Sequence, residues 1–286
     1  MQQLHLEEED FNKFWAAMKE KLPIVFRVNP NFPRYQAFCS KIQNEEFIRS
    51  LIPCEEKAIE QEEENAVENK EATKLELLNW YPGDILYSMN TNKNILRKDK
   101  AFTLFHQYLQ KLFDSGLVSR QELVSMLPPL YLNAAPDDIV LDMCAAPGSK
   151  TNQIIEMMYG ERRRLAGGCV VANDADYGRA QMLIHQLQRS GTAGMVVINH
   201  PGQFLPELHG PKNGETKERF KYDKILCDVP CSGDGATRKI PLKWANWHTN
   251  DGMALHTLQL SILIKGINLL KCGGSLVYST CSLNPI

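Results

Sequence analysis

Two cysteines of this 286-residue chain stand in short loops of serine, proline and glycine, where a thiol can take part in chemistry. Cys231 follows Asp228-Val229-Pro230, and Cys281 follows Ser279-Thr280, each after an apolar run typical of a buried strand. A thiol becomes a nucleophile when a nearby cation or helix terminus lowers its pKa, and Lys150 is the candidate cation. The two loops therefore predict covalent catalysis, and the residues alone do not rank one cysteine above the other.

Cysteine is also a common buried residue, and pairs of cysteines bind zinc. A zinc site at Cys227 and Cys231 would need a second pair of ligands, and none stands at matching spacing. The eight cysteines include no Cys-x-x-Cys pair, so they are expected to be reduced thiols of an intracellular protein. No metal site is expected.

A third loop follows an expected strand at 137–141 and leads into an expected helix from Thr151 to Tyr159. Its small residues let the backbone approach a ligand closely, and Gly148 relieves the restriction on φ at the turn. A dinucleotide loop would need three spaced glycines, and a phosphate-binding loop would need Gly-Lys-Ser/Thr in that order. Neither pattern is present, which leaves another nucleoside-type ligand or an ordinary turn.

Asp174 ends the second expected strand of the same sheet. An acid at this position in doubly wound sheets binds the ribose hydroxyls of a nucleoside ligand. The alternative is a role at the start of the helix that follows from Tyr177. Asp174 is therefore a candidate ligand-binding residue.

Two thiols, a carboxylate and a lysine around such a pocket have one coherent use. Position 5 of a pyrimidine does not accept a methyl group unaided, but a thiolate added at C6 makes C5 nucleophilic. An acid must then bind the N3/N4 edge, and the C5 proton must leave before the thiol is expelled. The base would have to leave any stack to reach the site.

The periodicity predicts a parallel sheet covered by helices on both faces. Its strands are expected at 137–141, 170–172, 195–198, 222–227 and 275–278, with helices at 177–188 and 255–270. Before it, helices are expected at 5–22, 34–51, 102–113 and 119–126, with a strand at 24–28 that contains Arg27. The charged stretch 55–74 is expected to be a solvated loop or a frayed helix, and the polar loop 205–219 is expected to be mobile.

Bulk properties exclude other classes of protein. No apolar run approaches the roughly 18–20 residues that span a bilayer, and the acidic start is no signal peptide. The formal net charge of −2 does not indicate nucleic-acid binding, but averages hide local patches. One such patch, Lys93, Arg97, Lys98 and Lys100, suits a phosphate backbone or a solvated surface.

The motifs resemble those of the Nop/Sun-type RNA (cytosine-5)-methyltransferases, most closely the eukaryotic tRNA (cytosine-5)-methyltransferase branch. The resemblance covers nearly the whole chain. It is carried by the following stretches: Asp142-Met143-Cys144-Ala145-Ala146-Pro147-Gly148-Ser149-Lys150-Thr151, Ala172-Asn173-Asp174, Cys227-Asp228-Val229-Pro230-Cys231-Ser232-Gly233-Asp234-Gly235 and Tyr278-Ser279-Thr280-Cys281-Ser282-Leu283-Asn284-Pro285-Ile286.

The resemblance implies a Rossmann-like α/β methyltransferase sheet at 116–286 and a smaller α+β RNA-binding region at 1–115, in which the Arg27 strand and the basic patch contact RNA. Cys281 would attack C6, Asp228 would hold the cytosine edge, Cys231 would assist product release, and Lys150 would position base or cofactor. The residues that would bind S-adenosylmethionine are Cys144, Ala145, Ala146, Pro147, Gly148, Ser149, Lys150, Asp174, Pro201 and Asp228.

Two departures from the family's pattern affect these expectations. Pro201 stands where the family has an acid near the adenine, and Gln203 or backbone groups would have to substitute. The family also continues beyond Ile286 into its last strands, so the chain is expected to be a shortened form with an exposed sheet edge.

A catalytically impaired RNA-binding fragment and an enzyme for rRNA or mRNA are the alternative functions. A DNA methyltransferase is a further alternative and would attack with Cys231. We expect tRNA as partner, a monomer, no membrane, and work in the nucleus or nucleolus and also the cytoplasm.

Overall fold

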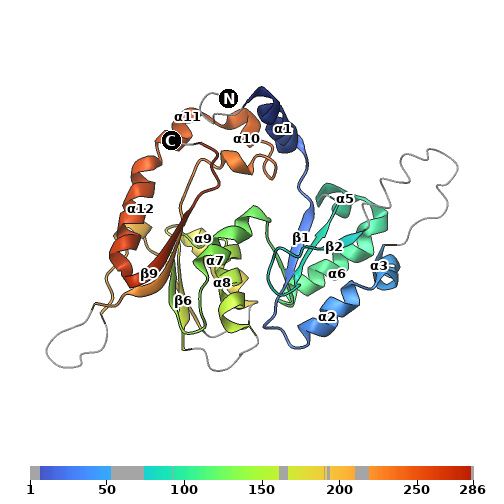
Figure 1. Ribbon diagram of the computed structural model, residues 1–286, viewed down its shortest axis with the longest axis horizontal. Coiled ribbons are helices and arrows are strands. Elements are labelled where there is room, and N and C mark those ends of the chain that lie inside the picture. Colours follow the sequence, from blue (N-terminus) through green and yellow to red (C-terminus); the bar gives the residue numbers. More distant parts are fainter. Residues whose placement is uncertain are drawn as a thin grey trace.

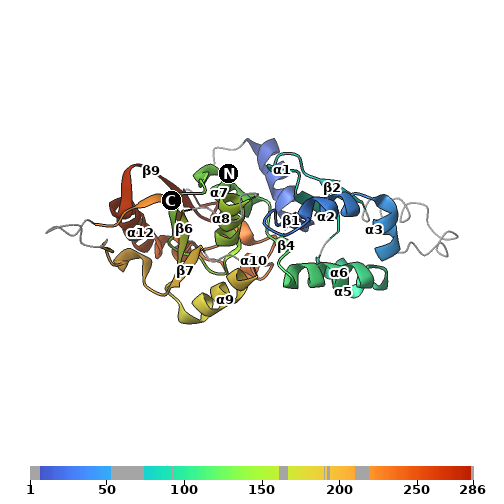
Figure 2. The ribbon, with the colours of Figure 1, turned by 90° about the horizontal axis from the view of Figure 1, so that it is seen from below.

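The computed structural model describes residues 7–52, 74–91, 93–160, 167–189, 191, 194–209 and 219–284. They form two halves that lie side by side, each built on one β-sheet (Figure 1, Figure 2). Most of the charged stretch 55–74 and most of the polar loop 205–219 lie outside the described residues.

The first half is an antiparallel sheet with helices packed against it. Its strand order is β2-β3-β1-β4, and the two inner strands are almost completely buried. The elements are α1 (Glu8–Lys19), β1 (Ile24–Val28), α2 (Tyr35–Ile42), α3 (Glu45–Leu51), β2 (Leu75–Leu77), β3 (Leu86–Met89), α5 (Lys93–Lys98), the 3-10 helix η3 (Lys100–Phe102), α6 (Thr103–Asp114) and β4 (Val118–Arg120).

Two expected helices of this region were wrong. The helix expected at 34–51 is divided, because the Asn44 side chain accepts a hydrogen bond from the Phe47 amide (3.0 Å) and begins a new helix, α3. The helix expected at 119–126 is strand β4, which pairs with β1, followed by a short 3-10 turn. Pro128 and Pro129 stand in the first turn of the helix that follows, where a helix needs no amide donor.

The second half is the expected parallel α/β sheet, and the predicted fold class is confirmed. Its strand order is β7-β6-β5-β8-β9, and every pair of neighbours is parallel. The elements are η4 (Val124–Met126), α7 (Leu127–Leu132), β5 (Ile139–Asp142), α8 (Ser149–Tyr159), β6 (Cys169–Asn173), α9 (Tyr177–Gln188), β7 (Met195–Ile198), η5 (Gly202–Phe204), β8 (Tyr222–Asp228), η6 (Asp234–Ala236), α10 (Lys243–Asn246), α11 (Thr249–Met253), α12 (His256–Leu269) and β9 (Leu270–Ser279).

Alternating side chains along the strands build two separate cores. Val140 of β5 packs with α8 and α9 on one face of the sheet, and its neighbour Leu141 packs with α12 on the other. Figure 1 shows these helices on opposite sides of the sheet. Because both faces are covered, the middle parts of the inner strands are apolar, and Asp142, Asn173 and Asp228 stand at the carboxyl ends of β5, β6 and β8.

The two halves meet in a buried polar network between β1 and α8. Arg27 and Glu156 are 0% and 2% exposed, and their side chains form an ion pair of 2.6 Å. Glu156 also accepts hydrogen bonds from Ser119 (2.7 Å) and Asn152 (2.6 Å). Arg27 therefore serves the interface between the halves, and the expectation that it contacts RNA is wrong.

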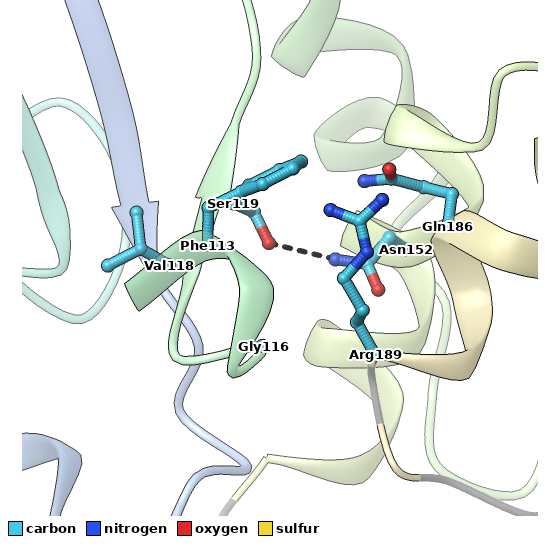
Figure 3. A pocket seen from close by; sticks show the side chains of 7 residues that line it. All are labelled: Phe113, Gly116, Val118, Ser119, Asn152, Gln186 and Arg189. Atoms are coloured by element: carbon cyan, nitrogen blue, oxygen red, sulfur yellow. Dashed lines mark hydrogen bonds between the residues drawn. The ribbon is translucent and has the colours of Figure 1, made fainter. Parts of the chain in front are cut away.

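A small hollow lies at the same seam. Figure 3 shows its lining, in which Asn152 donates to Ser119 (2.9 Å) and the Arg189 guanidinium faces the Phe113 ring (4.2 Å). The lining residues are Phe113, Gly116, Val118, Ser119, Asn152, Gln186 and Arg189. None of the predicted site residues is among them, so this hollow is a feature of the seam and not the candidate site.

Candidate active site

The register of the parallel strands brings the predicted loops to one edge of the sheet. Asp142 of β5 lies opposite Leu226 of β8, and Asp228 at the end of β8 lies opposite Ser279 of β9. The carboxyl ends of the three neighbouring strands β5, β8 and β9 therefore lie at one edge of the sheet. Lys150 lies in the first turn of α8, the helix that follows β5. The four predicted catalytic residues meet here although they are far apart in the sequence.

Asp228 is held from two sides. The Lys150 ammonium lies 2.7 Å from Oδ2, and the Ser279 hydroxyl donates to Oδ1 at 2.7 Å. Lys150 and Asp228 keep 18% and 28% of their side chains exposed, so a ligand can still reach the pair. Lys150 thus contacts the carboxylate and not a thiol, which differs from the first interpretation of its charge. Ser279 is a positioning group that the sequence analysis missed, although it stands within the quoted Cys281 motif.

The two cysteines face each other across the loops. Their Sγ atoms are 3.0 Å apart, and the Cys281 amide donates to the Cys231 sulfur at 3.2 Å. The contact between the two thiols is the main cause that lowers the pKa of Cys231 to about 6, helped by two backbone amides and opposed by burial. The same contact raises the pKa of Cys281 above its ordinary value. At neutral pH the pair therefore shares one proton, and the backbone amide that Cys281 donates to the Cys231 sulfur favours the thiolate at Cys231.

This proton distribution predicts how the free protein reacts with iodoacetamide. Because the pKa of Cys231 is lowered, this residue is mainly a thiolate above about pH 6 and mainly a protonated thiol below it. Alkylation of Cys231 should therefore have its midpoint near pH 6. In Cys281→Ala, which lacks the thiol donor, the midpoint should move up toward the ordinary thiol range near 8.5. Peptide mass spectrometry measures both, with exposed Cys272 as the internal reference thiol; an unchanged midpoint in Cys281→Ala would contradict the shared proton.

The predicted cofactor loop is tied to the end of β6. Asp174 Oδ2 accepts from the Ala146 amide at 3.1 Å, and the Arg179 guanidinium binds the Ala146 carbonyl at 2.6 Å. Gly148 has a φ of 104°, and a Cβ there would lie 2.9 Å from the Leu183 side chain. Only glycine fits this turn without strain, because both the backbone conformation and the space exclude a side chain. Arg179 was missed because its role depends on a contact across two loops.

Pro201 lies in the segment that follows β7, next to the buried side chain of Asn173. Asn173 anchors this neighbourhood, because its Nδ2 donates to the carbonyls of Met143 and His200, both at 2.9 Å. Its Oδ1 accepts from the His200 amide at 3.0 Å. One buried side chain therefore fixes the ends of β5, β6 and β7 relative to one another. The sequence analysis quoted Asn173 without giving it this role.

Asp142 lies beneath the loop. It is 1% exposed, Thr151 donates to Oδ2 at 2.7 Å, and Oδ1 has no hydrogen-bond partner among the described residues. Burial raises the pKa of Asp142 to about 7, against the opposing hydrogen bond from Thr151. An unpaired buried carboxylate oxygen suits a ligand that brings a positive charge or a donor. Together with Asp174, it makes this edge suitable for a cationic nucleoside ligand.

Other cysteines of the motifs have different surroundings. Cys227 is completely buried and contacts Met143 through its sulfur (3.3 Å), while burial raises the pKa of Cys144. These two thiols are packing groups. Within the described ranges, no cluster of three His, Cys, Asp or Glu side chains could hold a metal ion. None of the described helices has the length and apolar character needed to cross a membrane.

Comparison with known proteins agrees with this geometry. The family described as 16S rRNA methyltransferase RsmB/F matches residues 129–286. The fold and the site thus define a Rossmann-like methyltransferase. The chain belongs to the RsmB/F family, and the predicted resemblance is confirmed.

Individual relatives add detail. The chain is 39% identical over 297 residues to the multisite-specific tRNA:(cytosine-C(5))-methyltransferase trm4b of Schizosaccharomyces pombe, covering 97% of this chain and 42% of the relative. The corresponding Saccharomyces cerevisiae enzyme is 49% identical over 211 residues, covering 73% and 31%. The chain thus spans less than half the length of these relatives. The NSun6 structure from Pyrococcus horikoshii with SFG has a TM-score of 0.63 at 21% identity, covering 97% and 80%, and shares the fold.

Proposed function

We propose that this chain carries the catalytic centre of an enzyme that methylates C5 of cytosine in tRNA, with S-adenosylmethionine as methyl donor. The observation that carries the proposal is the pair of sulfurs 3.0 Å apart beside the Lys150–Asp228 ion pair. Nucleophilic attack on a base needs only one thiol. Two adjacent thiols sharing one proton suit a reaction in which a covalent bond to the base is first made and then broken.

The cofactor edge fits S-adenosylmethionine, which supplies an electrophilic methyl group next to a sulfonium charge. Asp174, already oriented by the Ala146 amide, would accept the ribose hydroxyls. The buried Oδ1 of Asp142, which has no hydrogen-bond partner among the described residues, would help to stabilise a positive charge bound at the loop. The remaining predicted residues would contribute backbone groups of the turn, and Pro201 would provide an apolar contact in place of the usual acid.

The thiol pair would carry the first proton transfer. Cys281 attacks C6 through its sulfur as its proton passes to the Cys231 thiolate. The step forms one S–C bond, and the pair keeps its single proton. The electrons of the C5=C6 bond make C5 nucleophilic. Asp228 accepts from the N4 amino group, and the Lys150 ammonium stabilises the charge that develops along the N3 edge.

Release would reverse the thiol chemistry. After methyl transfer the C5 proton leaves to solvent, the S–C6 bond breaks and the double bond re-forms. As the S–C6 bond breaks, Cys231 donates its proton to the leaving Cys281 sulfur, which restores the resting pair. This cycle gives Cys231 two roles, first as base and then as acid, both within 3.0 Å of the nucleophile.

One observation favours a second candidate. The Cys281 amide donates to the Cys231 sulfur and the pKa of Cys231 is lowered, so Cys231 is the favoured thiolate of the pair, and a thiolate is the more reactive nucleophile. In this alternative Cys231 itself attacks C6, as in DNA cytosine methyltransferases. The site geometry would be unchanged, but the covalent bond would join a different residue.

Methyl transfer from labelled S-adenosylmethionine to unmodified tRNA tests the proposed function. We expect 5-methylcytosine in the nuclease digest of the tRNA, identified by mass spectrometry. Asp174→Asn should lower the affinity for the donor roughly tenfold to 100-fold, because it removes a charged hydrogen-bond acceptor. Asp176→Asn is the matched control, since asparagine also caps a helix and Asp176 caps α9. Methylation of another atom, or equal loss in both variants, would contradict the proposal.

A further inference from the structure

The segment between β8 and α12 joins the two cysteine loops. The Gly235 amide donates to the Cys281 carbonyl at 2.9 Å, and the Lys243 ammonium binds the Ser232 carbonyl at 2.6 Å. Positions 229–255 contain three cations, Arg238, Lys239 and Lys243, and two acids, Asp234 and Asp251. The segment next to the thiols therefore carries a formal charge of about +1, with its cations grouped between the two acids.

The same segment presents an aromatic ring that meets another ring from the opposite half of the molecule. Trp244 of α10 contacts Trp15 of α1 edge to face, with ring centroids 5.0 Å apart. Figure 1 shows α1 and α10 next to each other where the two halves approach at the top of the view. Arg238 strengthens this junction, because its Nε donates to the Glu20 carbonyl at 2.9 Å.

These rings remain partly exposed to solvent. Trp15 is 40% exposed and Trp244 is 42% exposed, and no residue of α1 is buried. Phe11 stacks on Trp15 at 6.2 Å, and the Lys19 ammonium lies 5.3 Å from the same ring. A helix that buries no residue and presents stacked rings, with acids in its first turn and a lysine in its last, leaves an amphipathic surface open beside the site. Large exposed rings near a site indicate a binding surface.

We propose that Trp15 and Trp244 form a stacking platform for unpaired RNA bases next to the target cytosine, with phosphates held by Arg238, Lys239 and Lys243. The inference rests on the proposed function, because it assumes an RNA substrate at the thiol pair. Aromatic rings bind unstacked bases of any sequence, and nearby cations track the backbone. A base that leaves its helix to reach Cys281 leaves neighbours that need such a support. The platform includes one ring from each half, so RNA would bridge them.

RNA fits this surface better than a protein partner does. Glu20 contacts Arg238 at 3.9 Å, whereas Lys239 is exposed and forms no ion pair within the described ranges. Exposed aromatic rings beside such cations match a polyanion with π-faces. It also places the binding surface directly on the segment that holds both cysteine loops.

The test compares two RNA stem-loops that differ only in the nucleotides flanking the target cytosine, which are natural in one and abasic in the other. Trp244→Ala and Trp15→Ala should each raise the Kd for the natural RNA roughly 5- to 100-fold, the usual range for losing one stacked base. The Kd for the abasic RNA should change less than twofold.

Trp244→Phe should recover most of the affinity, and RNA should quench tryptophan fluorescence less in either alanine variant. The kcat at saturating RNA should stay within about threefold of wild type.

Trp80→Ala is the matched control, because Trp80 is also exposed (47%) but lies between β2 and β3 of the first half. It should leave both Kd values unchanged. Equal losses on natural and abasic RNA would overturn the platform, since they would indicate a structural role, and unchanged binding of natural RNA would overturn it as well. In either case wild-type methyl transfer would still support the proposed function. A wild-type chain that neither binds nor methylates RNA would overturn both.

Discussion

Replacing Cys281 with serine is expected to abolish covalent capture of RNA, whereas replacing Cys231 with serine should cause adducts to accumulate. The probe is tRNA containing 5-azacytidine, which lacks the C5 hydrogen and so cannot complete the elimination that releases the enzyme. A serine hydroxyl cannot replace the thiol as nucleophile at neutral pH, so methyl transfer by Cys281→Ser should fall on the order of 10⁴-fold or more. Denaturing gels of wild type and both variants measure the adduct.

The two thiols differ in what their loss leaves behind. In Cys231→Ser the remaining thiol regains an ordinary pKa, so attack continues slowly, but the partner that returns the proton is missing. With unsubstituted tRNA this variant should therefore hold a stable adduct that wild type does not show. Cys272→Ser, which changes an exposed thiol outside the site, should behave as wild type. An adduct that survives in Cys281→Ser but disappears in Cys231→Ser would establish the alternative in which Cys231 attacks.

Replacing Glu156 with alanine is expected to lower the free energy of unfolding by about 3–5 kcal/mol, the range for breaking a buried ion pair. Arg27 is 0% exposed and would keep its charge in the interface, and Ser119 and Asn152 would each lose an acceptor. The double variant Arg27→Met/Glu156→Leu should be far less destabilised, because apolar groups of similar volume leave no unpaired charge. Urea denaturation followed by circular dichroism measures these changes.

An exposed ion pair provides the control for this prediction. Glu45 and Arg49 form a pair of 3.1 Å on α3 with 78% and 74% of their side chains exposed. Glu45→Ala should change stability by about 0.5 kcal/mol or less, since solvent screens such a pair. If Glu156→Ala costs no more than Glu45→Ala, the charge at the seam is not buried as described, and the two halves are not joined by this network.

Local sequence determined the elements and the list of reactive residues. The predicted bounds of the helix Tyr177–Gln188 and the strand Met195–Ile198 match the structure, because a helix cap at Asp176 and a β-branched run act within a few residues. The motif loops could be placed at strand ends for the same reason. The errors at 34–51 and 119–126 arose because Asn44 begins a second helix within an apolar helical pattern, and because Val118–Arg120 pairs with β1, which is far away in the sequence.

Tertiary structure decided what these residues do to one another. Which thiol is ionised depends on a contact between Cys231 and Cys281 that is set by the register of β8 with β9, and no local pattern encodes that register. Arg27 could be placed in a strand, but only the packing of β1 on α8 shows that it is paired and buried. The meeting of Trp15 with Trp244 likewise depends on how the two halves dock. Periodicity and turns are short-range, whereas proton sharing and burial depend on atoms brought together from distant parts of the chain.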